Sequence, residues 1–366
     1  MNNPLKKNEI HISELDGLRG IAIIIVVFFH YWTMAIVPFG KASKLIIGFS
    51  SLFWSGVDLF FVLSGFLIGG ILIRNRTSPN YFKTFYIRRF TRIFPIYFLS
   101  LALFFICSSI PFFMQIPDLI NSPIPIWPFG LFIQNFFIIP DNLTPAWLVP
   151  TWSLAIEEQF YLFIPLIVYF LPPKKLPYFI TALIIIAIGL KIHFGRGISD
   201  FYTPDRYIGL LLGILIAFFF NHKTFWNWIV VNKRIWSLVT FLVFVCGAWM
   251  IKLDKYNIIF VFVWLAIFYS LILITILSNK MNLFSRFCNQ NWLKTWGKYS
   301  YGIYIIHIPV FYILNFVLFN EAKLVINDYF DLFKPVVSVV ISFGLAYLSY
   351  HLMEKKFLNF GKKFSY

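Results

Sequence analysis

The first apolar run of the sequence holds one histidine and begins beside one arginine. It reads DGLRGIAIIIVVFFHY over residues 16–31, with Arg19 near its start and His30 deep inside it. Their spacing places them within about 20° of one helix face and roughly 16 Å apart along the helix axis. An ionisable side chain inside a bilayer-spanning helix usually marks a functional site. A neutral imidazole is well suited to remove a proton from a hydroxyl, so His30 is a candidate general base.

Three acidic residues lie in other apolar runs. Asp58 belongs to GVDLFFVLSGFLIGG, and Glu157 and Glu158 belong to TWSLAIEEQFYLFIP. Adjacent helical residues point about 100° apart, so only one of the two glutamates can face a given cavity. Depths counted from the ends of the spans place Asp58 and Glu157 level with His30. We expect one of these carboxylates to fix the imidazole tautomer, as the acid does in hydrolytic triads. For Asp58, the alternative is a buried ion pair with an arginine.

A basic cluster opens the third apolar run. Arg88, Arg89 and Arg92 fall within FYIRRFTRIFPIYF, and helical spacing puts Arg88 and Arg92 on one face. The guanidinium fork suits phosphate oxygens, so we predict that this cluster binds a cytosolic polyanion. The alternative is that these arginines only orient the protein in the membrane.

Four further residues support these clusters. Asp16 is placed to pair with Arg19, and Ser64, which precedes several glycines, allows close approach of helices. His307, in YSYGIYIIHIPVF, is interpreted as structural rather than catalytic. Trp152 belongs to an aromatic belt at the outer interface or to a stacking floor for a sugar.

The composition is that of a multi-pass membrane protein. Hydrophobic residues make up 60% of the 366 residues and charged residues only 13%. A spanning helix needs about 20 apolar residues, and we predict an all-α bundle of about ten transmembrane helices. The predicted spans lie near 17–37, 46–73, 93–114, 151–171, 177–194, 206–221, 235–252, 257–278, 299–319 and 335–353. The segment 125–139 is too short to span and is predicted to be interfacial or re-entrant.

The basic residues indicate an orientation. With the N-terminus and the C-terminus in the cytoplasm, 22 of the 31 lysines and arginines fall on the cytoplasmic side, as the positive-inside rule predicts. This distribution explains the net charge of +16 without a nucleic-acid partner. The three cysteines have no metal-binding or disulfide spacing, and no metal is expected. We expect one domain over residues 1–366 with no appended soluble domain, in a bacterial cell membrane. The sequence does not indicate an oligomeric state.

Five motifs in order resemble the membrane-bound acyltransferase 3 family. They are LDGLRGIAIIIVVFFHYW (15–32), GVDLFFVLSGFLIGGIL (56–72), FYIRRFTRIFPIYFLSL (85–101), WSLAIEEQFYLFIPL (152–166) and SYGIYIIHIPV (300–310). The resemblance implies that Arg19 and His30 are essential and that Arg89 and Arg92 form the RxxR element. It also implies that Trp152 and Glu157 form a Trp–x4–Glu element, which favours Glu157 over Glu158.

The resemblance further implies a function. The family O-acylates sugars of surface polysaccharides, so acyl-CoA, most simply acetyl-CoA, would be a donor substrate and no bound cofactor is expected. The acceptor would be a carbohydrate hydroxyl, on O-antigen, peptidoglycan, exopolysaccharide or a lipid-linked glycan. His30 would act as general base in direct transfer or carry the acyl group covalently. The competing interpretation is a lipid-linked sugar transporter or flippase with a proton relay of buried His, Asp and Glu.

Overall fold

The computed structural model describes residues 12–138, 145–194, 203–252, 258–322 and 325–366. Most residues in these ranges are helical, and the β-structure among them is limited to an isolated bridge between Ile36 and Ile326. Nine helices of the described part are long and apolar enough to cross a membrane. The predicted fold class, an all-α multi-pass membrane protein, is confirmed.

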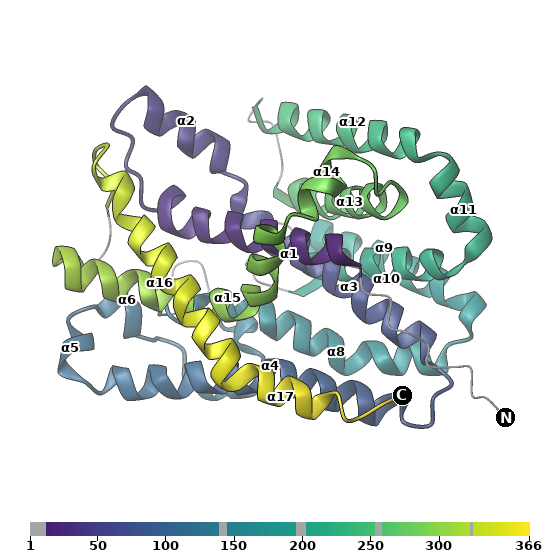
Figure 1. The fold of residues 1–366 in the computed structure, drawn as a ribbon, viewed down its shortest axis with the longest axis horizontal. Coiled ribbons are helices and arrows are strands. Elements are labelled where there is room, and N and C mark those ends of the chain that lie inside the picture. The colour runs from purple at the N-terminus through teal and green to yellow at the C-terminus, as the bar shows by residue number, and fades with distance from the viewer. Residues whose placement is uncertain (1–11, 139–144, 195–202, 253–257, 323–324) are drawn as a thin grey trace.

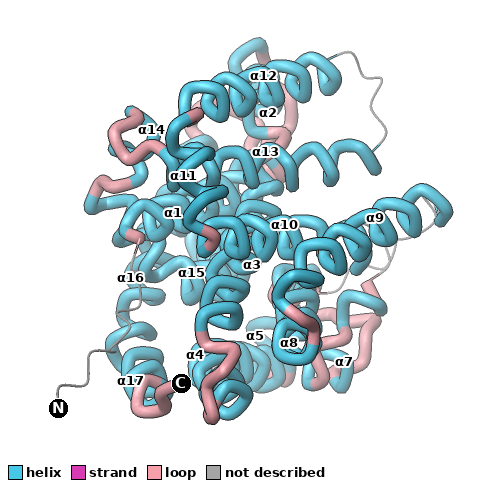
Figure 2. The backbone as a smooth tube through the Cα atoms, turned by 90° about the vertical axis from the view of Figure 1, so that its right-hand side faces the viewer, coloured by secondary structure: helices cyan, strands magenta, loops and turns pink. Residues whose placement is uncertain are grey.

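The helices follow one another with short connections. The long ones are α1 (Ser13–Phe28), α3 (Gly56–Arg74), α4 (Tyr81–Ser108), α8 (Trp152–Phe170), α9 (Leu176–Phe194), α10 (Thr203–Asn221), α12 (Lys233–Lys252), α13 (Ile258–Ser278), α15 (Asn291–Phe319) and α16 (Lys334–Ser349). The short ones are α2 (Lys41–Ser50), α5 (Pro111–Met114), α6 (Pro117–Ile120), α7 (Trp127–Gly130), α11 (Lys223–Val231), α14 (Leu283–Cys288) and α17 (Lys355–Gly361). In Figures 1 and 2, α1, α3 and α15 lie inside the bundle, and α12 lies at its periphery.

The predicted spans agree with these helices, with two differences in shape. The second span is composite, because α2 and a 3-10 turn precede α3 within Lys41–Arg74. The sixth span bends at its end: α10, 19 residues long, is followed by α11 after a bend of 98°. The short predicted run 206–221 is therefore one arm of a bent pair.

The segment 125–139, predicted to be interfacial or re-entrant, packs against two helices. It contains α7 and a 3-10 turn over Gln134–Phe136, and residue 139 lies outside the described residues. The Tyr97 hydroxyl of α4 donates to the Phe129 carbonyl at 2.7 Å. The Gln159 amide of α8 donates to the Phe132 carbonyl at 2.8 Å. These side-chain donors satisfy carbonyls that regular helix would otherwise satisfy, as irregular backbone within a membrane requires.

Glycines set the closest helix contacts. A Cβ atom on Gly65 of α3 would collide with the Leu210 carbonyl of α10, and one on Gly297 of α15 would collide with the Asp16 carbonyl of α1. Because these residues lack a side chain, the α3–α10 and α1–α15 pairs pack backbone against backbone, as small residues permit in membranes. These two pairs hold the elements that carry the polar clusters.

Several segments that the charge pattern assigns to one side of the membrane do lie at one end of the bundle. The beginnings of α1 and α15 line one cavity together with Leu358 of α17. The first turn of α4 binds the C-terminal segment, because the Thr84 hydroxyl donates to the Ser365 carbonyl at 2.9 Å. Helices α4 and α17 run side by side there (Figure 1).

Candidate active site

His30 contacts a second histidine. It lies on a π-helical turn, Phe29–Thr33, that continues α1, and its Nδ1 is 3.2 Å from Nε2 of His307 on α15. The same Nδ1 is 2.9 Å from the carbonyl oxygen of Val26. π-Turns are rare and are frequent at functional sites. The sequence showed two isolated intramembrane histidines, and the structure joins them.

His307 is fully buried, with 0% of its surface exposed. Its Nδ1 is 2.8 Å from the Tyr304 carbonyl and 3.2 Å from the Ile303 carbonyl of its own helix. The Tyr31 hydroxyl donates to the His307 carbonyl at 2.6 Å and contacts the Ser342 hydroxyl at 2.8 Å. The second histidine is therefore held on both its ring and its backbone.

A central cavity gathers residues from each of the other polar clusters. It is small, about 100 Å³, and is enclosed by α1, α3, α4, α8 and α15. Among its lining residues are the predicted Arg19, Ser64, Arg89, Arg92 and Glu157. Segments separated by more than a hundred residues in sequence thus meet in one polar space within the bundle.

The hydroxyl of Tyr161 connects two of the residues that line this cavity. The Tyr161 hydroxyl donates to Glu157 at 3.0 Å and lies 2.5 Å from the Ser64 hydroxyl. Ser64 was expected to serve close packing, but its side chain contacts Tyr161 across the cavity. Tyr161 was missed in the sequence because tyrosine is common in membrane helices. Its position one turn after Glu157 was the available signal.

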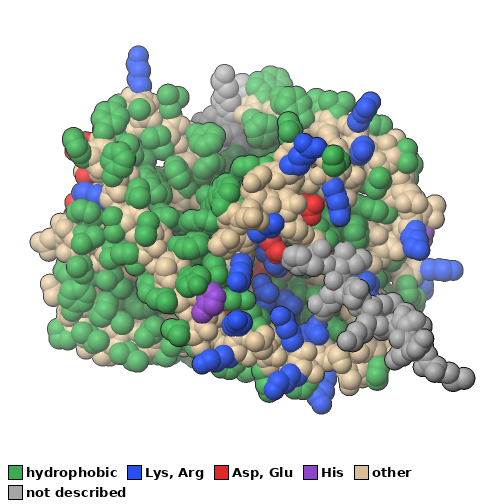
Figure 3. Space-filling model, viewed as in Figure 1, with side chains coloured by type: hydrophobic (Ala, Val, Ile, Leu, Met, Phe, Trp, Pro, Cys, Tyr) green, Lys and Arg blue, Asp and Glu red, His purple; other side chains and the backbone are tan. Residues whose placement is uncertain are grey.

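A basic mouth opens next to the central cavity. This second cavity has a volume of about 540 Å³ and shares Arg19, Arg92 and Tyr301 with the first. Lys294 and Lys298, from the first turns of α15, add two cations to its wall. Asp16 and Glu354 also line it, with Asp16 3.8 Å from Arg19. Figure 3 shows one face of the molecule. Most lysines and arginines on it lie on the right half, and hydrophobic side chains cover most of the left half.

The arginines of α4 separate into two groups. Arg89 and Arg92 line the central cavity. Arg88 instead donates from Nε to the Phe364 carbonyl at 3.1 Å, and its guanidinium lies 5.4 Å from the centre of the Tyr366 ring. The structure therefore places Arg88 outside the cavity that Arg89 and Arg92 line, and the binding of a polyanion by the whole cluster stays a prediction. Lys294 and Lys298, which the sequence did not single out, accompany Arg92 instead.

The two adjacent glutamates face different cavities, as their 100° separation predicts. Glu157 lines the central cavity, and Glu158 lines a lateral cavity of about 950 Å³ between α4, α8 and α17. Arg89 and Tyr161 line both spaces. Most of the other side chains around the lateral cavity are apolar, among them Phe90 and Phe360.

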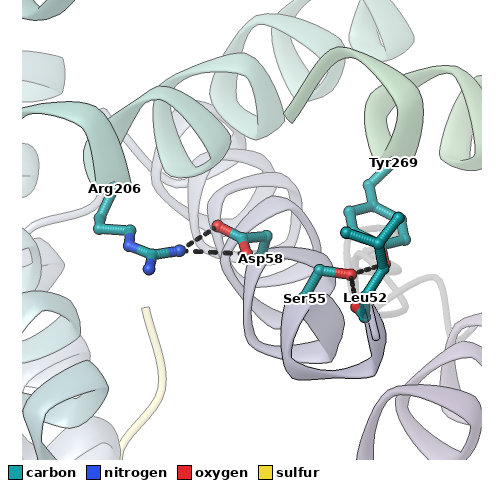
Figure 4. A network of polar contacts seen from close by, with 5 residues as sticks. All are labelled: Leu52, Ser55, Asp58, Arg206 and Tyr269. Atoms are coloured by element: carbon teal, nitrogen blue, oxygen red, sulfur yellow. Dashed lines mark hydrogen bonds and ion pairs between the residues drawn. The ribbon is translucent and has the colours of Figure 1, made fainter. Parts of the chain in front are cut away.

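Asp58 forms an ion pair with Arg206 of α10 (Figure 4). The Arg206 guanidinium donates to both carboxylate oxygens, at 3.0 and 3.2 Å, and both residues are 5% exposed. Trp152 belongs to this cluster, because its ring centre lies 5.0 Å from the guanidinium. The sequence considered an arginine partner for Asp58 but did not identify Arg206.

The expected contact between His30 and a carboxylate differs from the structure. Among the described residues, the hydrogen-bond partners of His30 are Val26 and His307, and Asp58 and Glu157 are engaged elsewhere. Equal depth counted along the sequence therefore did not predict contact, which depends on how the helices face one another. Tyr304 links the two regions, because its side chain lines the central cavity and its carbonyl contacts His307.

The described residues include no group of three or more His, Cys, Asp or Glu side chains that could hold a metal ion. What they offer is a basic mouth, a cavity with three guanidinium groups, and a histidine pair. Such an arrangement can bind an anion, stabilise developing negative charge and accept a proton from a hydroxyl.

Comparisons with known proteins identify the family of the chain. A family model described as an acyltransferase domain matches residues 12–351. The chain is 29% identical to O-acetyltransferase OatA of Staphylococcus aureus, over 94% of this chain and 57% of that protein. It is 27% identical to peptidoglycan O-acetyltransferase OatA of Listeria monocytogenes, over 97% of this chain and 58% of that protein. The chain thus spans less than two thirds of these relatives. No solved structure matches it significantly.

Proposed function

Because the chain belongs to the acyltransferase 3 family, we propose that it moves an acetyl group from acetyl-CoA to a hydroxyl of a cell-surface carbohydrate. The observation that carries the proposal is the central cavity, where Arg19, Arg89 and Arg92 lie with Glu157 beside a basic mouth. Peptidoglycan is the acceptor that we test first, because a relative similar over nearly the whole chain is named for it.

The donor phosphates are proposed to bind at the mouth. Lys294, Lys298 and Arg92 line it, and ammonium and guanidinium groups form strong charge-assisted hydrogen bonds with phosphate oxygens. The mouth lies at the end of the bundle that the charge pattern assigns to the cytosol. The pantetheine arm would then extend past Arg19 into the central cavity, because that residue lines both spaces.

Acyl transfer is proposed to use His30 as the base. The imidazole takes the proton of the acceptor hydroxyl, the hydroxyl oxygen bonds to the thioester carbonyl carbon, and the carbon–sulfur bond breaks. The proton on His30 then passes to the leaving CoA thiolate, so the imidazole returns to its neutral form. His30 is not among the residues that line the central cavity, so the thioester would extend past Tyr304, which lines that cavity and contacts His307, to reach the imidazole.

Acetylation of the cell wall tests this role. His30→Ala should lower the O-acetyl content of peptidoglycan by at least about hundredfold, the usual contribution of a general base. Mass spectrometry of muramidase digests from a deletion strain carrying each variant measures this content. His351→Ala is the matched control, because His351 also contacts the carbonyl four residues earlier, at 2.9 Å, but lies on the π-helical turn Tyr350–Glu354 after α16 and lines neither the central cavity nor the mouth. Wild-type acetylation by His30→Ala would remove His30 from the mechanism.

Purified protein separates the remaining alternatives. Incubation with radiolabelled acetyl-CoA and a soluble glycan should release CoA and label the glycan. A mass increase of one acetyl group on the protein without acceptor would indicate a covalent acyl-His30 intermediate instead of direct transfer. No thioester consumption, together with movement of a lipid-linked sugar across vesicles, would support the transporter interpretation.

A further inference from the structure

We propose that His307 is a positioning residue that holds His30 in a single tautomer, with its proton on Nδ1 and its basic lone pair on Nε2. The inference rests on the proposed role of His30 as the base. It assigns to a neutral histidine the task that a carboxylate performs in hydrolytic triads. The argument proceeds from two backbone carbonyls and one distance between rings.

The first carbonyl fixes the proton of His307. Its Nδ1 lies 2.8 Å from the carbonyl oxygen of Tyr304 and 3.2 Å from that of Ile303. A carbonyl oxygen only accepts hydrogen bonds, so Nδ1 must carry the proton. In the neutral ring Nε2 then holds a lone pair, and it points at His30 from 3.2 Å.

The Val26 carbonyl and Nε2 of His307 together fix the proton of His30. Its Nδ1 lies 2.9 Å from the Val26 carbonyl oxygen and 3.2 Å from Nε2 of His307. Both neighbours are acceptors, so Nδ1–H is shared between them, and the opposite tautomer would set lone pairs against each other at both contacts. Nε2 of neutral His30 therefore carries the lone pair. It has no hydrogen-bond partner among the described residues, and the ring is only partly buried.

The position of His307 is itself fixed from several sides. The Tyr31 hydroxyl donates to the His307 carbonyl at 2.6 Å, and the Tyr31 ring stacks on Phe311 at 4.4 Å. Complete burial of His307 excludes competing water. When His30 takes up a proton on Nε2, its Nδ1–H becomes a stronger hydrogen-bond donor. The lone pair on Nε2 of His307 is already in place to accept that hydrogen bond. His307 keeps its own proton throughout, so it neither gains nor loses charge.

Activity with substitutions at His307 tests this role. His307→Phe keeps a buried ring but removes the acceptor, and we expect the kcat for acetyl transfer to fall about tenfold to hundredfold with an unchanged KM for acetyl-CoA. His307→Gln, whose side-chain oxygen can accept the His30 proton, should recover a large part of that loss. His351→Gln is the control and should behave as wild type. Equal losses in the two His307 variants, or a loss confined to KM, would contradict the positioning role.

Nitrogen resonances test the tautomer without any measurement of activity. In protein labelled with 15N-histidine, the His30 signals, assigned by their absence in His30→Ala, should report a protonated Nδ1 and an unprotonated Nε2. In His307→Phe only the Val26 carbonyl accepts from Nδ1–H, so the same signals should report a larger fraction of the Nε2-protonated tautomer than in the wild-type protein. A protonated Nε2 on His30 in the wild-type protein would overturn the inference. An active His30→Ala variant would end the proposed function, whereas the tautomer result would still decide the contact with His307.

Discussion

At the residue scale, the Asp58–Arg206 pair explains how two charges are accommodated inside the protein. Each residue is 5% exposed, and the guanidinium donates to both carboxylate oxygens. The Arg206 guanidinium carbon also lies 3.9 Å from the centre of the Phe262 ring and 5.0 Å from that of Trp152. Aromatic faces attract a cation and replace part of its hydration. The pair is therefore a structural element that joins α3 to α10.

Breaking this pair on one side should destabilise the protein strongly. Arg206→Met should lower the free energy of unfolding by about 3–5 kcal/mol, because it removes the ion-pair partner of a buried carboxylate. Adding Asp58→Asn to it should restore much of that loss. Thermal unfolding of the detergent-solubilised variants measures both effects. If Asp58 acts on His30 instead, Asp58→Asn alone would lower kcat while the unfolding temperature of Arg206→Met stayed near wild type.

At the element scale, the sequence predicted which helices form but not how they turn toward one another. Apolar length predicted the spans. The sequence also named Arg19, Arg89 and Glu157 as candidate site residues in separate clusters, and these three line one cavity. Azimuth depends on packing between helices distant in sequence, which periodicity within one helix does not encode. For this reason the sequence did not predict the contact between His30 and His307, and it did not identify Arg206 as the arginine that pairs with Asp58.

Close packing of α3 on α10 gives a prediction at this scale. Gly65→Ala would set a methyl group against the Leu210 carbonyl, so the two helices must separate. Overpacking of this kind costs about 1–3 kcal/mol. Gly189→Ala in α9 is the matched control, because a Cβ atom there meets no atom within 4 Å. Unfolding temperatures should fall for Gly65→Ala only. Equal unfolding temperatures for the two variants would show that α3 and α10 accommodate the added methyl group without loss of stability.

At the scale of the whole molecule, the positive charges are distributed unevenly between the two ends of the bundle. On the face shown in Figure 3, most lysines and arginines lie on one half. Residues of α1, α15 and α17 line the basic mouth. The sequence predicted an excess of cations on this side, and it predicted that a polyanion binds to the cluster of Arg88, Arg89 and Arg92. The sequence analysis did not single out Lys294 and Lys298. Their approach to Arg92 depends on the packing of α15 beside α1, which no local pattern shows.

If the mouth binds the phosphates of the donor, reversing its charge should weaken donor binding selectively. Lys294→Glu with Lys298→Glu should raise the KM for acetyl-CoA at least about tenfold, the value of one lost charge-assisted hydrogen bond. Acetyl-pantetheine carries the same thioester without phosphates, so its KM should be unaffected by the substitutions. Lys174→Glu, an exposed lysine after α8, is the control for net charge. Equal increases in KM for the two donors would place the effect on the thioester path, and an unchanged KM for acetyl-CoA would assign phosphate binding to another surface.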